Sequence, residues 1–181
     1  MKSLAIVAVI GILALMTTSN PLSAQSVWIG GGATFPTSDY GEFANTGYQF
    51  MAGVGIPVGD QGVSVGAGGS YGQNNHEAVD GDKTNLYGFT GYVEYDFAGR
   101  DAERGFYVLA ELGLLWHKFS SDTSPESTES GFAYGGSVGY AFPLGGVSGW
   151  AEGRFTQASI SDANTQFFGI AAGISIPLGG N

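Results

Sequence analysis

The chain has 181 residues, no cysteine, 32 glycines and a net charge of −10. An apolar content of 43% excludes a disordered chain, the lack of cysteine excludes disulfides, and the acidity argues against nucleic acid as a partner, because its phosphates would be repelled. Charged residues make up only 12%, about half of the ~25% typical of soluble domains, so we expect much of the surface to face something other than water.

The N-terminus predicts export from the cytoplasm. Lys2 is followed by an apolar run over residues 4–16, a polar break and the small residue Ala24, which is the pattern of a cleaved signal peptide. The apolar run is too short to span ~30 Å of hydrocarbon comfortably. We therefore predict a signal peptide over residues 1–24 and one domain over residues 25–181.

After Ala24 the sequence alternates between apolar and polar residues in about eight runs, and such alternation predicts strands with one apolar and one polar face. The predicted strands cover residues 27–35, 47–56, 62–72, 85–97, 106–117, 132–142, 147–156 and 166–176. Each is near the ~9–11 residues that a tilted transmembrane strand needs, whereas ordinary strands average ~5–6.

The breaks between these runs are of two kinds. Three short stops repeat a Pro-Val/Leu-Gly pattern at residues 57–59, 143–145 and 177–179, and four longer polar breaks cover residues 36–46, 73–84, 118–131 and 158–165. Proline and glycine belong at strand ends and turns, so long and short connections alternate. Backbone groups in hydrocarbon must all be paired. The pattern therefore predicts an all-β fold, a closed antiparallel up-and-down transmembrane barrel of about eight strands.

Side chains sort by face within these strands. The polar face is rich in small residues such as Gly30, Gly53 and Ser137, which suit a narrow interior. Aromatic residues on the apolar face gather near the strand ends, as expected of two girdles at the membrane interfaces. The predicted girdle residues are Tyr48, Tyr71, Tyr87, Tyr95, Phe97, Trp116, Tyr140 and Phe142.

The signal peptide, the aromatic-and-glycine alternation of residues 87–97 and 132–142 and the rhythm of short turns and long loops resemble the small outer-membrane barrels of the OmpA/OmpX type. The resemblance covers essentially all of the mature chain. It implies a monomer in the outer membrane of a Gram-negative-type bacterium, in contact with outer-membrane lipid and inserted by the barrel-assembly machinery. The last strand lacks the terminal aromatic residue usual in such barrels, so a soluble, lipocalin-like barrel with its apolar faces inward stays open as an alternative.

Four charged residues share the polar face of their strands. A basic residue facing lipid would cost roughly 2–4 kcal/mol at the bilayer midplane, so Arg154 is predicted to point inward, near one or more of Glu94, Glu111 and Glu152. We favour an internal salt-bridge plug over a gated ion path, because a narrow barrel leaves little room. Glu94 is the expected partner of Arg154, and Trp150 would share this inward face near the turn end, unless a bulge shifts it to the girdle.

No catalytic residue, metal ligand or cofactor is predicted. The acidic segment 80–85 lacks the glycine and terminal glutamate of a calcium loop, and only His117 with Ser120 could serve an enzyme acting on envelope lipid. The main functional prediction is a non-enzymatic barrel with a structural or adhesive role. Its acidic surface loops over residues 73–84 and 118–131 could take an extracellular ligand.

Overall fold

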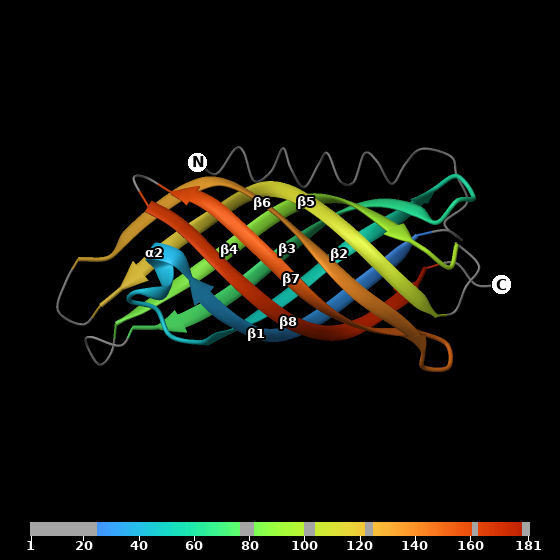
Figure 1. The fold of residues 1–181 in the computed structure, drawn as a ribbon, viewed down its shortest axis with the longest axis horizontal. Helices are drawn as coiled ribbons and strands as arrows, with labels where there is room; N and C mark the ends of the chain where they lie inside the picture. Colours follow the sequence, from blue (N-terminus) through green and yellow to red (C-terminus); the bar gives the residue numbers. More distant parts are fainter. Residues whose placement is uncertain (1–24, 77–81, 100–103, 122–124, 161–162, 179–181) are drawn as a thin grey trace.

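The computed structural model describes residues 25–76, 82–99, 104–121, 125–160 and 163–178. Eight strands form a closed antiparallel barrel in which each strand pairs with its neighbours in the chain and β1 pairs with β8 (Figure 1). The strands are β1 (Ser26–Thr37), β2 (Gly47–Val58), β3 (Val63–Asn75), β4 (Lys83–Asp96), β5 (Gly105–Ser120), β6 (Ser127–Pro143), β7 (Ser148–Ile160) and β8 (Ala163–Pro177). The predicted all-β, up-and-down fold is confirmed. The predicted signal peptide lies outside the described residues.

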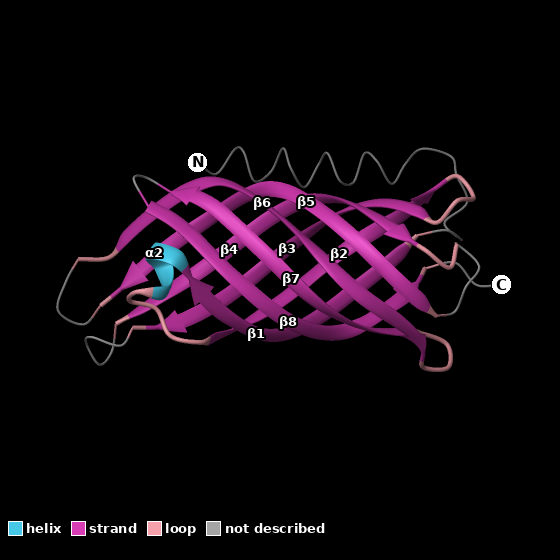
Figure 2. Cartoon of the chain, in the orientation of Figure 1, coloured by secondary structure: helices cyan, strands magenta, loops and turns pink. Residues whose placement is uncertain are grey.

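Strands make up the whole wall of the barrel, and the one-turn helix α2 (Ser38–Gly41) lies at one end (Figure 2). We call this end the loop end, and the opposite end, which holds the β2–β3, β4–β5 and β6–β7 connections, the turn end. Within the described residues no helix is long and apolar enough to cross a membrane.

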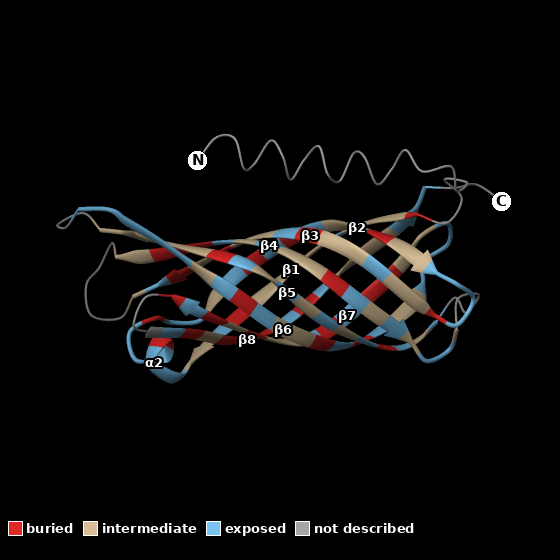
Figure 3. Cartoon of the chain, turned by 90° about the horizontal axis from the view of Figure 1, so that it is seen from above, coloured by how far each residue is buried: buried red, intermediate tan, exposed pale blue. Residues whose placement is uncertain are grey.

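The apolar face of each strand points out of the barrel. Large apolar side chains are exposed all around the wall, with Phe106 at 63% and Ile170 at 65%, and buried and exposed residues alternate along the strands (Figure 3). A soluble barrel would bury these side chains inside. The lipocalin-like alternative is therefore wrong, because the apolar surface faces outward.

The repeated proline and glycine stops lie at strand ends, as predicted. β6 and β8 end on Pro143 and Pro177. Proline has no backbone N–H group, and at the end of a strand its absence costs the sheet no hydrogen bond. Gly59 and Gly145 follow with φ of 68° and 79°, a left-handed conformation that favours glycine. These residues make the tight connections of the turn end.

The strands at the loop end are longer than predicted. β3 continues to Asn75, β4 begins at Lys83, β5 runs to Ser120 and β6 begins at Ser127, so about half of the predicted loops 73–84 and 118–131 is paired sheet. Alternation disappears there because nearly all side chains on both faces of the extended sheet are polar, with Phe119 as an exception, while the backbone ladder continues. Between these strands, residues 77–81 and 122–124 lie outside the described part of the chain.

Large aromatic side chains fill the lumen, which the abundance of small inward residues did not predict. Trp28 and Trp150 point inward and meet edge to face, with ring centroids 6.4 Å apart. A Cβ on Gly53 would overlap Trp28, and one on Gly139 would overlap Tyr107. The inward glycines are therefore the surfaces on which these rings pack.

Candidate functional site

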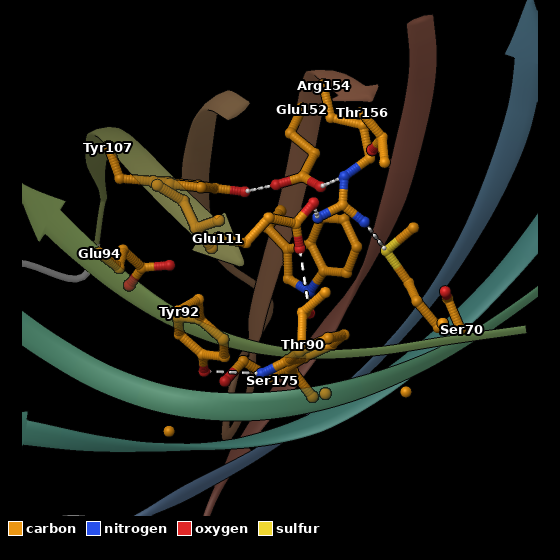
Figure 4. Close-up of a pocket in the computed structure, with 18 of the residues that line it drawn as sticks. Ser70, Thr90, Tyr92, Glu94, Tyr107, Glu111, Glu152, Arg154, Thr156 and Ser175 are labelled. Carbon is orange, nitrogen blue, oxygen red and sulfur yellow. Dashed lines mark hydrogen bonds and ion pairs between the residues drawn. The ribbon is translucent and has the colours of Figure 1, made fainter. Parts of the chain in front are cut away.

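A buried charge network occupies the middle of the barrel. Arg154 on β7 lies between Glu111 on β5 and Glu152, with N···O distances of 3.2 and 3.5 Å (Figure 4). The side chains of these three residues are only 6–9% exposed. The longer contact is an ion pair without hydrogen-bond geometry, since Arg154 Nε is buried with no hydrogen-bond partner among the described residues.

Neighbouring side chains satisfy the carboxylates of this network. The Thr90 hydroxyl donates to Glu111 Oε2 at 3.1 Å, and the hydroxyls of Tyr107 and Ser137 donate to Glu152 Oε2 at 3.0 and 2.9 Å. Buried ions are stable only when they are paired and hydrogen-bonded in this way. These contacts link side chains of β4, β5, β6 and β7, so the arrangement can hold four strands in register across the lumen.

Glu94 stands apart from this network. Among the described residues no ion pair joins Glu94 to Arg154, and Figure 4 shows Glu94 to one side of the cluster, on the side of Tyr107. The expected pairing of Glu94 with Arg154 is therefore wrong. Glu94 does share the inward face of β4, in the row Arg154–Ser137–Leu109–Glu94 across the sheet. This row is inclined to the barrel axis, so its members lie at different depths.

A cavity of about 240 Å³ lies against the network. Its lining reaches from Asp96 and Ser148, at the turn end of their strands, to Leu115 and Phe167 deeper in the barrel. Gln49 also lines it, and its side-chain amide nitrogen is buried without a partner in the described chain. No group of three or more potential metal-ligating side chains is present among the described residues.

The loop end of the lumen is closed by the segment that carries α2. Tyr40 is only 1% exposed, and its hydroxyl donates to Asn74 Oδ1 at 3.2 Å, while Asn74 Nδ2 donates to Thr34 Oγ1 at 3.0 Å. Burial raises the pKa of the Tyr40 phenol well above its ordinary value, so it stays a neutral donor. Its ring joins an apolar cluster with side chains from five strands: Ala44, Leu86, Leu115, Ala133, Ala158, Ile160 and Phe167. We call this assembly the mouth plug.

Both histidines of the chain lie at the loop end beside the mouth plug. His117 packs edge to face on Tyr40 at 5.4 Å, and His76 packs between Phe43 and Phe119, each at 5.2 Å. His117 points inward and Ser120, three residues later, is on the opposite face, where its hydroxyl donates to Glu126 at 3.3 Å. The structure does not bring the candidate pair His117 and Ser120 together.

The predicted girdle residues lie on the outer surface of the barrel. Near the loop end, the rings of Tyr48, Tyr71 and Tyr87 follow one another across β2, β3 and β4, with centroids 6.3 and 5.3 Å apart, and Trp116 is paired with Tyr87. Near the turn end, Tyr95 contacts Phe97 and Tyr140 contacts Phe106. Phe142 follows Tyr140 on the same outward face.

Comparison with known proteins decides the family. The sequence matches the outer membrane protein beta-barrel domain over residues 5–179. The chain belongs to this family. An outer-membrane barrel of eight strands explains both the apolar outer wall and the two levels of aromatic rings, and the location that follows is the outer membrane of a Gram-negative-type bacterium.

Solved structures share the fold of this outer-membrane barrel. Neisserial surface protein A has 16% sequence identity and a TM-score of 0.69, covering 84% of this chain and 96% of its own. The N-terminal barrel domain of Pseudomonas aeruginosa OprF has 16% identity and a TM-score of 0.51, covering 83% and 97%. A major outer membrane protein of Thermus thermophilus has 10% identity and a TM-score of 0.52, covering 84% and 99%. A search of curated proteins finds no match.

Sequence reasoning missed the residues that close the outer-membrane barrel. Trp28 is two residues from the inward-facing Gly30, so alternation alone predicts that its side chain points inward. Tyr40 had no such signal, because it lies in a break with no periodicity, where only the three-dimensional path of the chain brings it back over the lumen.

Proposed function

We propose that this protein is a non-enzymatic outer-membrane barrel whose work is structural and adhesive, done by the surface at its loop end. The observation that carries the proposal is a lumen filled at several levels, by the mouth plug, by the Arg154 network and by the packed rings of Trp28 and Trp150. A filled lumen leaves the exterior as the surface on which a partner can act. The separation of His117 from Ser120 removes the candidate enzyme pair.

The most extended part of this surface is the hairpin of β5 and β6. Its pairing continues from Trp116↔Ser130 to Phe119↔Ser127, beyond the outer aromatic rings. Residues 127–130 are all exposed and polar. A paired ribbon presents these side chains without the ordering entropy that a free loop would lose on binding. The sequence of the loop end is rich in Asp and Glu, so a cationic partner surface is favoured. The name of Neisserial surface protein A agrees with a surface role.

Attachment of cells tests this proposal. Bacteria carrying the protein would be compared with bacteria carrying a trimmed variant, in which an Asn-Gly turn replaces residues 118–128 and joins the paired residues His117 and Glu129. The control replaces Asp60 and Gln61, in the turn at the opposite end, by the same dipeptide. We expect the trimmed variant to lose attachment to poly-lysine-coated glass and the control to keep it.

Equal attachment of the trimmed and native proteins would contradict the adhesive role. The filled lumen has its own test, because purified protein in planar bilayers should show no stable conductance. Large, long-lived channels would overturn that part of the proposal.

A further inference from the structure

We propose that the outer surface of β4 and β5, just beyond the outer aromatic rings, binds the phosphate-bearing headgroup of an outer-leaflet lipid. The inference rests on the shown family and on the position of two lysines, and it does not require the adhesive role. Longer connections of such barrels face the outside, so the loop end meets the outer leaflet.

The two lysines are neighbours on the outer face. Lys118 is paired across the sheet with Asn85, and Lys83 with Ser120, so Lys83 and Lys118 are diagonal neighbours, roughly 7–8 Å apart. Asn85 continues the outward parity of Tyr87, and its side chain accepts a hydrogen bond from the outward Tyr71 at 3.0 Å. Two ammonium groups at this spacing can contact one phosphate from both sides.

Their depth matches the headgroup level. Tyr87 and Trp116 are paired across β4 and β5 and belong to the outer aromatic rings. Asn85 and Lys118 are the next outward-facing pair along these two strands, on the side of the loop end. Aromatic rings of this kind sit at the interface between hydrocarbon and headgroups. Lys118 is therefore two residues, about 7 Å along the strand, farther out than the ring level, where lipid phosphates are found.

This positive pair is exceptional in an acidic chain. Besides Lys83 and Lys118, the basic residues in the described part of the chain are Arg104, at the turn end, and Arg154, inside the lumen. Polar residues at the corresponding outward level of β6, β7 and β8 are uncharged, with Ser130, Gln157 and Gln166 as examples. The cationic groups of the outer interface thus lie together on one side of the barrel.

Glu126 is the acidic group that forms an ion pair with this lysine pair in the described part of the chain. Its carboxylate contacts Lys118 Nζ at 2.9 Å, with side chains 58% and 35% exposed. Ion pairs this exposed contribute little stability, so a phosphate can replace or share this contact. The contact with Glu126 leaves the ammonium group of Lys118 at the surface, over β5.

Trp116 supplies a local probe for the test. The other tryptophans, Trp28 and Trp150, meet inside the lumen, whereas Trp116 lies on the outer face beneath the lysines. The protein would be reconstituted into phosphatidylcholine vesicles containing either spin-labelled phosphatidic acid or spin-labelled phosphatidylcholine, with the label near the headgroup. Quenching of tryptophan fluorescence then gives the relative affinity of the two lipids for this face.

We expect the native protein to prefer phosphatidic acid, because each lysine near an anionic lipid contributes about fivefold in affinity. The Lys83→Gln/Lys118→Gln variant should lose at least about fivefold of this preference. Lys83→Arg/Lys118→Arg should keep it, and Arg104→Gln, which removes one positive charge at the opposite end, should leave it unchanged. Added salt should weaken it in the native protein.

Heat-dependent gel mobility would verify that each variant is folded, and Lys118→Gln alone serves if the double variant is not. Absence of a preference in the native protein would overturn the proposal. An unchanged preference in the folded glutamine variants would also overturn it.

Discussion

Replacement of Arg154 by Met should be among the most destabilising single changes in the lumen. Methionine keeps much of the volume of the arginine stem but removes the cation between Glu111 and Glu152. Both carboxylates keep their hydroxyl donors, yet they are left as two negative charges in a closed interior. Losing one partner of a buried pair leaves the other uncompensated.

The distances set the size of the effect. At 3.2 and 3.5 Å, each contact has a gross attraction of about 5 kcal/mol at an effective dielectric constant near 20. Desolvation of the three groups offsets much of this sum, and breaking a buried pair by removing one partner typically costs about 3–5 kcal/mol. We therefore expect Arg154→Met to lower the free energy of unfolding by about 3–5 kcal/mol at neutral pH.

Urea unfolding in lipid vesicles, followed by tryptophan fluorescence and gel mobility, measures this free energy. The matched comparison is the triple variant Arg154→Met/Glu111→Gln/Glu152→Gln, which removes the charges together. It should recover a large part of the loss, because neutral amides can keep the hydroxyl donors of Thr90 and Tyr107. A decrease below about 1 kcal/mol for Arg154→Met alone would refute the account of the network as a structural ion cluster.

Three further outcomes follow from other parts of the lumen. Glu94→Gln should leave the free energy of unfolding unchanged or raise it, since Glu94 has no ion-pair partner among the described residues. A decrease above about 1 kcal/mol in the same urea assay would mean that Glu94 is stabilised by an ion pair after all. Gly139→Ala should destabilise by about 1–3 kcal/mol through overlap with the Tyr107 ring, whereas Gly153→Ala, which meets open space, should be nearly silent. Burial lowers the pKa of His76 in the folded protein. On acidification this histidine is therefore protonated at a higher pH in the unfolded chain than in the folded one, and stability should fall as the pH drops below about 6.5. Protease accessibility of the α2 segment at pH 8 and pH 5 checks this, and an equal pH response in His76→Gln would contradict it.

Alternation alone was enough to predict the wall of this barrel. Along β4 the parity of Tyr87, Phe89 and Tyr95 separates an outer face from an inner one, and lipid outside makes that separation strict. The loop ends of the strands were harder to predict because lipid no longer selects side chains there. Ser130 on the outer face of β6 and Glu129 on its inner face are both polar, so periodicity ends before the backbone pairing does.

The partner of Arg154 shows why parity cannot predict contacts across a lumen. Glu94, Leu109, Ser137 and Arg154 occupy one row of the sheet, but strands of a barrel tilt by ~35–45°. Three steps of ~4.8 Å between strands at such a tilt displace the end of the row by about 9 Å along the barrel axis. Glu111 is two residues nearer the loop end than Leu109, which compensates for the two steps between β5 and β7. This stagger explains why Arg154 meets Glu111 and passes Glu94, and it requires the register as well as the alternation.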